Sequence, residues 1–382
     1  MIVRSNYTEL ENIVDCLDNQ RIPVSDEERQ KRQGDVPYYG ANGQVGFIND
    51  SLFDEELLLL AEDGGSWGPK EKCAYIISGK SWVNNHAHVL RCKQNTNIRF
   101  LMYFLNYSDL RSYVSGTTRG KLNQQRMNQI KVFWPEINKQ KRIAENLTRA
   151  ESALEKRRQT LRLADQFLKS AFLGMFGDPS RNPMKWPVKQ IGDVVLVSQY
   201  GTSEKSNTES NGYIVLGMGN ITYDGQLDLS KVNYVDMTEK EFNQLRLVSG
   251  DVIFNRTNST DLVGKTACWR REEKAVLASY LVKLKLVPSV VPEFFSFLLN
   301  SSFYKNIFAQ RCKKAVGQSN ISPTLLKEFD VFVPPQPIQQ KFADLVQKVE
   351  KLKEKQRQSE AQLQTLFNSL MQKAFRGELF KE

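Results

Sequence analysis

Amide and basic side chains gather in loop-like segments in both halves of the 382-residue chain. The first half holds Asn84, Asn85 and His86, then Thr117-Thr118-Arg119-Gly120-Lys121; the second holds Asn255-Arg256-Thr257-Asn258 and Gly317-Gln318-Ser319-Asn320. Asn and Gln pair bidentately with adenine and Arg with guanine, whereas Lys, Ser and Thr hold phosphates. These residue types therefore suit contact with nucleic acid, although polar loops are also the default at any protein surface.

Residues that could perform catalysis are scarce. The segment from Ser259 to Gly264-Lys265-Thr266 resembles a phosphate-binding loop, but serine replaces its first glycine and strand-like residues follow it instead of a helix. His86 and His88 would share one face of a strand, but no third metal ligand accompanies them. We therefore predict no catalytic residue and no metal site, and we interpret the two histidines as structural or phosphate-contacting.

Basic residues outnumber acidic ones, 53 to 43, which gives a formal net charge of +10. Such an excess fits a polyanionic partner because each neutralised phosphate releases counterions, although general solubility would also explain it.

The first ten residues hold no apolar signal core and the apolar runs elsewhere are short, so we expect neither a secretory signal nor a membrane span. Five scattered cysteines without a CxxC pair fit reduced thiols in a cytosol.

One long unit occurs twice in the chain. Val132-Phe133-Trp134-Pro135 aligns with Val331-Phe332-Val333-Pro334, and the same shift pairs Gln140 with Gln339 and Asn123 with Ser322. A repeat of this length indicates a duplicated domain rather than a solenoid, whose repeats are about 20 to 50 residues long. The predicted order is globular unit, helix, globular unit, helix.

The two helical segments show the clearest periodicity. Apolar residues follow alternating spacings of four and three, and each segment is about 36 residues long, or about 54 Å. We assign these side chains to a seam between the helices: Leu147, Leu154, Leu161, Leu168, Leu345, Val349, Leu352, Leu363, Leu366 and Leu370. Two ordinary amphipathic helices on separate cores are the alternative. We expect both helices to end at a glycine, Gly177 and Gly377.

The globular halves contain short strand-like runs, which are Glu56 to Ala61, His88 to Cys92, Asp251 to Asn255 and Leu281 to Leu286. Asn123 and Ser322 are good N-cap residues for a short helix before each long one, and Pro323 suits a first helical position. Both halves are therefore predicted to be mixed α/β.

Several longer motifs resemble one protein family. The first half has Val36-Pro37-Tyr38-Tyr39-Gly40-Ala41-Asn42-Gly43, Gly46-Phe47, Glu62-Asp63-Gly64 and Trp82-Val83-Asn84-Asn85-His86-Ala87-His88. The second has Gly217-Met218-Gly219-Asn220-Ile221, Phe254-Asn255-Arg256-Thr257-Asn258, Val263-Gly264-Lys265-Thr266, Gly317-Gln318-Ser319-Asn320-Ile321, Val333-Pro334-Pro335 and Ala374-Phe375-Arg376-Gly377-Glu378-Leu379. Together, and in this order, they resemble the specificity subunits of type I restriction-modification systems. Trp134-Pro135-Glu136, where the family more often has a double proline, is one departure.

The resemblance implies an α+β fold with an internal pseudo-twofold repeat. Two mixed α/β target-recognition domains, residues 1–135 and 179–334, would be joined by two long helices, residues 136–178 and 335–382, that pair antiparallel as a coiled coil. It also implies a cytoplasmic protein that binds double-stranded DNA, two methyltransferase (modification) subunits and restriction-translocase subunits. S-adenosylmethionine, ATP and Mg²⁺ would belong to those partners, so that this chain itself holds no cofactor.

The residues that we expect to contact DNA come from the polar loops and from the family motifs. They are Tyr39, Asn42, Asn84, Asn85, His86, Arg119, Lys121, Tyr200, Asn220, Asn255, Arg256, Asn258, Lys265, Gln318 and Asn320.

The paired helices would hold two DNA-reading domains over half-sites about one DNA turn, roughly 34 Å, apart. The expected target is therefore bipartite, with a spacer that is not read. Two other classes stay open: a DNA-binding regulator without enzymatic partners, and an ATP-using enzyme built on Gly264-Lys265-Thr266.

Overall fold

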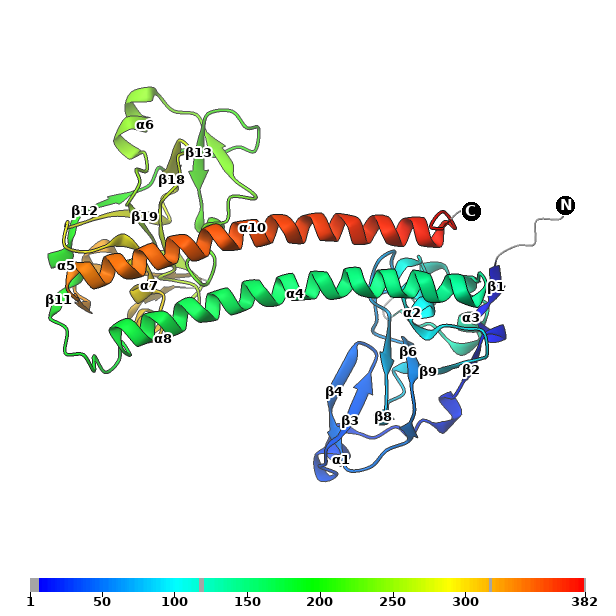
Figure 1. The fold of residues 1–382 in the computed structure, drawn as a ribbon. Helices are drawn as coiled ribbons and strands as arrows, with labels where there is room; N and C mark the ends of the chain where they lie inside the picture. Colours follow the sequence, from blue (N-terminus) through cyan, green and yellow to red (C-terminus); the bar gives the residue numbers. More distant parts are fainter. Residues whose placement is uncertain (1–6, 117–119, 316–317, 381–382) are drawn as a thin grey trace. The chain divides into compact units, whose positions relative to one another are not determined.

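The computed structural model describes residues 7–116, 120–315 and 318–380. They form two compact units, residues 1–159 with 357–382 and residues 160–356. Two helices of 40 residues each, α4 (Ile137–Phe176) and α10 (Gln336–Phe375), contribute one half to each unit (Figure 1). Both helices end where predicted, because Gly177 and Gly377 follow with φ angles of 84° and 73°, which favour glycine.

The first unit contains two four-stranded sheets. One has the order β2-β9-β6-β7 and the other β4-β3-β8-β5. Its strands are β1 (Tyr7–Glu9), β2 (Val14–Cys16), β3 (Val36–Gly40), β4 (Gly43–Ile48), β5 (Phe53–Asp54), β6 (Leu57–Ala61), β7 (Ala74–Ile77), β8 (Lys80–Val83), β9 (Ala87–Cys92) and β10 (Lys131–Phe133), and its shorter helices are α1 (Asp26–Lys31), α2 (Ile98–Tyr107) and α3 (Gln124–Asn128). All five residues of β6 are buried, which explains why this strand is a continuous apolar run rather than an alternating one.

The second unit contains a four-stranded antiparallel sheet, β12-β19-β15-β17, and two three-stranded sheets, β14-β13-β18 and β16-β21-β20. Its strands are β11 (Val188–Gln190), β12 (Val195–Tyr200), β13 (Tyr213–Leu216), β14 (Asn233–Val235), β15 (Val252–Asn255), β16 (Thr257–Asn258), β17 (Thr266–Cys268), β18 (Ala275–Leu277), β19 (Leu281–Leu286), β20 (Lys313–Ala315), β21 (Gln318–Asn320) and β22 (Asp330–Phe332). Its shorter helices are α5 (Ile191–Val194), α6 (Glu239–Leu245), α7 (Pro292–Leu299), α8 (Ser302–Arg311) and α9 (Pro323–Lys327). All four predicted strands are therefore present, as β6, β9, β15 and β19.

The repeated sequence folds in the same way in both units. β1 pairs with β10 and β11 pairs with β22, in both cases antiparallel. The short helices α3 and α9 are capped by the predicted residues, since the Asn123 side chain accepts from the Arg126 amide and Ser322 from the Leu325 amide. The recurrence of this strand pair and of the run of short helix, strand and long helix supports the interpretation of a duplicated domain.

A buried glutamine secures the start of each long helix. The Gln140 amide donates to the Asn95 and Pro135 carbonyls and accepts from the Asn97 amide. Gln339 repeats this with the Ser289 and Pro334 carbonyls and the Val291 amide. Each glutamine therefore satisfies backbone groups that would otherwise be buried without a partner.

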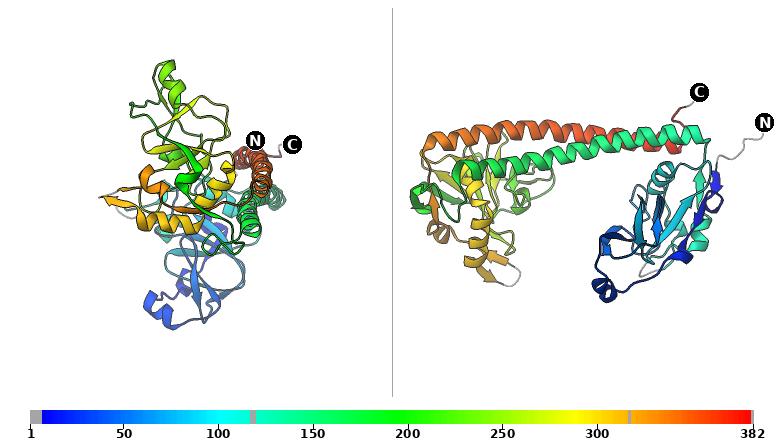
Figure 2. Two further views of the ribbon diagram at one scale, coloured as in Figure 1. Left: turned by 90° about the vertical axis from the view of Figure 1, so that its left-hand side faces the viewer. Right: turned by 60° about the horizontal axis from the view of Figure 1, so that its bottom comes forward.

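Within each unit, α4 and α10 lie against each other and run in opposite directions (Figures 1 and 2). In the first unit, Arg158 on α4 pairs with Glu360 on α10, and Leu147 packs in one cluster with Met371 and Phe375. In the second unit, Asp165 pairs with Lys353, and the ring of Phe172 lies 5.4 Å from that of Phe342.

The seam differs from the sequence expectation at two positions of α10. Leu147, Leu154, Leu168 and Val349 are buried, and Leu161, Leu345, Leu363 and Leu370 are half-buried. The side chains of Leu352 and Leu366, however, are 48% and 50% exposed and lie outside the seam. Their neighbours Lys353, 2% exposed, and Phe367 face the packed side instead. The prediction was wrong at these two positions because the inward side chain is a paired lysine next to Leu352 and a phenylalanine next to Leu366.

Candidate nucleic-acid interface

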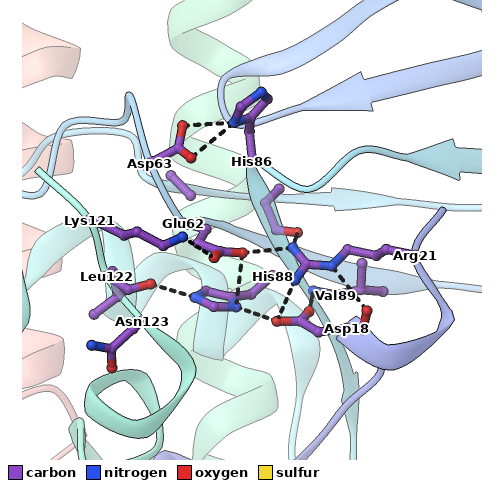
Figure 3. Close-up of polar contacts among 12 residues, drawn as sticks. Asp18, Arg21, Glu62, Asp63, His86, His88, Val89, Lys121, Leu122 and Asn123 are labelled. Atoms are coloured by element: carbon purple, nitrogen blue, oxygen red, sulfur yellow. Dashed lines mark hydrogen bonds and ion pairs between the residues drawn. The ribbon is translucent and has the colours of Figure 1, made fainter. Parts of the chain in front are cut away.

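Predicted contact residues of the first unit converge on the loop after β6 (Figure 3). The Asn42 amide donates to the Gly64 carbonyl over 3.0 Å, His86 Nδ1 lies 2.8 Å from Asp63 Oδ1, and Lys121 Nζ lies 3.1 Å from Glu62 Oε1. Asn42 and Lys121 are exposed and His86 is partly so. Three segments that are distant in sequence therefore present amide, imidazole and ammonium groups around residues 62–64.

Asn84 and Tyr39 support this cluster from the second sheet. Asn84 Oδ1 accepts a hydrogen bond from the backbone amide of His86 over 2.8 Å. The backbone amide of Asn84 donates to the Tyr39 carbonyl over 3.0 Å. The ring of Tyr39 packs beside Tyr75, whose hydroxyl donates to the Gly40 carbonyl. Asn85 is exposed next to them, whereas Arg119 lies outside the described residues.

A buried ion-pair network lies beneath the cluster (Figure 3). Arg21 pairs with Glu62 at 2.8 Å and with Asp18 at 3.0 Å, and it donates to the Ala87 carbonyl. Asp18 also accepts from His88 Nδ1 at 2.6 Å and from the Val89 amide at 2.9 Å. Sequence reasoning missed this network, because no local signal connects Arg21 and Asp18 with Glu62 across about 40 residues of chain.

The network keeps Asp18 ionised. Burial alone would raise the pKa of this carboxyl, but hydrogen bonds from His88 and the Val89 amide, with the charges of His88 and Arg21, hold the pKa below its usual value. The negative charge of Asp18 therefore helps to fix the first residues of β9, and with them the turn that carries His86.

The two histidines have different environments. His88, 1% exposed, directs Nδ1 at Asp18 and Nε2 at the Leu122 carbonyl, 2.7 Å away, so both ring nitrogens face oxygen acceptors. His88 is thus a structural residue that connects β9 to the segment before α3. His86 has a 40% exposed side chain and is the histidine available to a ligand.

Cys16, Asp18 and His88 bring possible metal-ligating atoms within 4.8 Å of one another. Both nitrogens of His88 are already engaged, and burial raises the pKa of the Cys16 thiol to about 12, which disfavours the thiolate that would bind a metal. The arrangement is therefore that of a hydrogen-bonded core cluster.

In the second unit, Arg256 is the most distinctive of the predicted contact residues. Its guanidinium lies over the ring of Tyr200, 5.0 Å from the centroid, and makes a long contact of 3.4 Å with the Ser279 carbonyl. No carboxylate pairs with Arg256 among the described residues. A partly exposed guanidinium that lies over the ring of an exposed tyrosine is well suited to bind a phosphate or a guanine edge.

The small sheet β16-β21-β20 carries the other predicted residues of this unit. Thr257 and Asn258 of β16 pair with Asn320 and Ser319 of β21. Asn320 donates to the Thr257 hydroxyl, Asn258 is half-buried and Gln318 is exposed. Because β16 follows Arg256 directly, the sheet brings Asn258, Gln318 and Asn320 near the Arg256–Tyr200 pair.

Three predicted contact residues of the second unit are buried, which corrects the sequence expectation. Asn220 accepts from the Gly217 amide and donates to the Asp228 and Lys231 carbonyls. Lys265 donates to the Met218 and Ile221 carbonyls, and burial lowers its pKa. Asn255 is fully buried. Motif position alone could not show that the loop of residues 217–221 covers Lys265.

The burial of Lys265 also bears on the nucleotide-binding alternative. Its Nζ is directed into the protein toward backbone carbonyls, and Thr266 begins strand β17 rather than a helix. A phosphate-binding loop needs the lysine and a helix N-terminus at the phosphate, so this segment does not have that arrangement. None of the helices in the part of the chain that the structure describes is long and apolar enough to cross a membrane.

The family profile of the type I restriction modification DNA specificity domain matches the chain twice, over residues 4–162 and 183–364. The specificity subunit of the type I restriction enzyme EcoKI from Escherichia coli is 25% identical over 361 residues, which cover 84% of this chain and 77% of that subunit. A specificity subunit of Methanocaldococcus jannaschii, MjaX, is 30% identical over 168 residues. That match covers 43% of this chain and only 39% of the relative.

The fold is also similar to solved structures. The crystal structure of the S subunit of a type I restriction-modification system from M. genitalium superimposes with a TM-score of 0.65 at 12% identity, over 98% of both chains. The fold and the two matching domains define a DNA specificity protein. The chain belongs to the family of type I restriction-modification specificity subunits.

Proposed function

We propose that this chain is the DNA-recognition subunit of a type I restriction-modification complex and that it reads a bipartite target. The main support is the duplication: two domains of one family, each with polar side chains at its surface of the types that can read bases, are connected by two long helices. The clusters differ in chemistry, with amides and an imidazole in the first unit and a stacked guanidinium in the second. Different half-sites are the expected consequence.

The proposed division of labour leaves catalysis to other chains. Residues 1–135 and 179–334 would each read one half-site, and residues 136–178 and 335–382 would set the spacer between them. Two modification subunits and the restriction-translocase subunits would dock on this framework in the cytoplasm, with S-adenosylmethionine, ATP and Mg²⁺ bound in those partners. The EcoKI relative is named as a specificity subunit of such an enzyme, which supports this assignment.

Long-read mapping of methylated adenines tests the proposal. Cells that express this chain together with its modification subunit should carry methylation at one bipartite motif, and cells that lack the chain should lose it. Purification of the tagged chain should bring down a methyltransferase. If the chain purifies alone and methylation is unchanged without it, the regulator alternative is favoured and the proposal fails.

A further inference from the structure

His86, which is partly exposed, forms a hydrogen-bonded pair with the mostly buried Asp63. His86 Nδ1 lies 2.8 and 3.0 Å from the two carboxylate oxygens of Asp63 (Figure 3). An ionised carboxylate only accepts hydrogen bonds, so Nδ1 must carry the proton. In the neutral imidazole the other nitrogen, Nε2, is then an acceptor.

The backbone holds the pair in place on both sides. The His86 carbonyl accepts from the Glu62 amide at 2.9 Å, and the His86 amide donates to Asn84 Oδ1. The buried pair of Arg21 with Glu62 fixes the loop from below. The side chain of Asp63 is only 15% exposed, whereas that of His86 is 40% exposed and its Nε2 has no partner among the described residues. In its neutral form the ring would therefore present one acceptor, Nε2, to the surface next to exposed Asn42, Asn85 and Lys121.

An acceptor on this surface can pair only with hydrogen-bond donors of the DNA. Phosphates and the carbonyl groups of guanine and thymine are themselves acceptors, so they cannot pair with an unprotonated Nε2. In the major groove, adenine N6 and cytosine N4 are the amino groups that donate hydrogen bonds. We propose that Asp63 is a positioning residue that holds His86 as the Nδ1–H tautomer, so that Nε2 selects a base that presents an amino donor in the major groove, which is adenine or cytosine. This inference rests on the proposed function, and it names the class of base at one position of the half-site that the first unit reads.

The tautomer can be measured directly because the chain has only two histidines. In the full chain labelled with ¹⁵N-histidine, the long-range ¹H–¹⁵N spectrum of His86 at neutral pH should show a protonated Nδ1 and an unprotonated Nε2. The variant His86→Asn assigns the signals, since only those of His88 remain. In Asp63→Ala the His86 tautomers should mix. A protonated Nε2 on His86 in the native chain would overturn the inference, and this readout does not depend on whether DNA is bound.

Base selection is measured on the assembled complex with its modification subunits. Binding to the mapped target is compared with binding to the three alternative bases at each position in the half-site of the first unit. At one position the native complex should prefer adenine or cytosine, and His86→Ala should reduce that preference by roughly tenfold, the size of one good base contact. The half-site of the second unit should stay unchanged. Asp109→Ala, which removes a surface carboxylate of the same unit, is the matched control.

A double variant separates positioning from a general structural effect. If Asp63 acts through His86, Asp63→Ala should lower the amino-base preference in the native background and change nothing further in the His86→Ala background. If His86→Ala lowers the affinity for all DNA sequences equally, His86 contacts a phosphate and the inference is overturned. A native complex without any sequence preference would instead refute the proposed function, while the tautomer would remain measurable.

Discussion

At the residue scale, the first unit separates structural polar groups from those available to a ligand. His88 and Asp18 satisfy each other in the interior, whereas His86 and Lys121 stand at the surface above them. A buried charge is costly unless it is paired and hydrogen-bonded, and Asp18 meets this condition through three partners. The interior network therefore positions the surface cluster without taking part in it.

Replacement of Asp18 by Asn should destabilise the protein at neutral pH by about 3 kcal/mol, because it removes the carboxylate that His88 Nδ1 contacts and leaves Arg21 with Glu62 as its one remaining carboxylate in this network. The pKa of Asp18 is lowered in the folded state, so its contribution is fully present above the unfolded value and is lost as the pH falls through the folded pKa. Urea denaturation should therefore show that the variant has a lower free energy of unfolding than the native chain at pH 7. This difference should disappear in strong acid. The variant Asp15→Asn, at an exposed position, is the control. A difference in the free energy of unfolding of the Asp18 variant that does not change with pH would contradict the prediction.

Arg256 offers a second test at this scale. Arg256→Lys keeps the charge but loses the planar guanidinium that stacks on Tyr200, so affinity for the cognate target should fall about tenfold and selectivity should relax in one half-site. Equilibrium binding to the mapped target and to its half-site variants measures both effects. Arg111→Lys, whose guanidinium is paired with Asp109, should leave both unchanged. A uniform loss across all sequences would show a phosphate contact instead.

At the element scale, the start of each long helix depends on one buried side chain. Gln140 and Gln339 occupy equivalent positions of the repeat, and each bridges three backbone groups. One group in each set, the Pro135 or Pro334 carbonyl, lies in the loop before the long helix, and the other two lie in the loop before α2 or α7 of the same unit. The glutamines therefore tie the direction of the helix to the domain that precedes it.

Substitution of Gln339 by Leu should lower the free energy of unfolding by roughly 2 to 4 kcal/mol, because similar volume is kept but the Val291 amide and two carbonyls lose their partner. Denaturant unfolding measures this, and Gln340→Leu, which alters an exposed neighbour, should change stability by less than about 0.5 kcal/mol. Equal effects of the two substitutions would show that burial of the amide is unimportant.

At the scale of the whole molecule, the proposed spacer function rests on the continuity of α4 and α10. Each helix begins in one unit and ends in the other, and its two halves pack on different cores. The ion pairs Arg158–Glu360 and Asp165–Lys353 fix the register of the two helices within their units. A change in helix length should therefore act on spacing and leave the reading surfaces intact.

Insertion or deletion of about four residues, one helical turn, between Arg157 and Thr160 should change the length of the unread spacer and neither half-site. Methylation mapping in cells that carry the variant gives the new motif. The same insertion between the exposed Glu272 and Glu273 should leave the motif as it is. Altered half-sites with a constant spacer would refute the role of the helices.

Local patterns in the sequence determined most of the architecture. The spacing of apolar residues, the glycines after Phe176 and at Gly377, and the caps Asn123 and Ser322 predicted elements that the structure contains, because these signals act within a few residues. The repeat and the family motifs likewise indicated two domains of one family, which the two profile matches confirm.

Tertiary structure decided which polar side chains reach the surface. Asn255 and Arg256 are neighbours in one motif, yet the first is fully buried and the second lies on Tyr200. Lys265 and Lys353 are both basic residues, but one is covered by the loop of residues 217–221 and the other faces Asp165 across the helix pair. Burial and hydrogen bonding depend on segments that are far apart in sequence, so residue type and spacing alone could not distinguish these groups from those that can meet DNA.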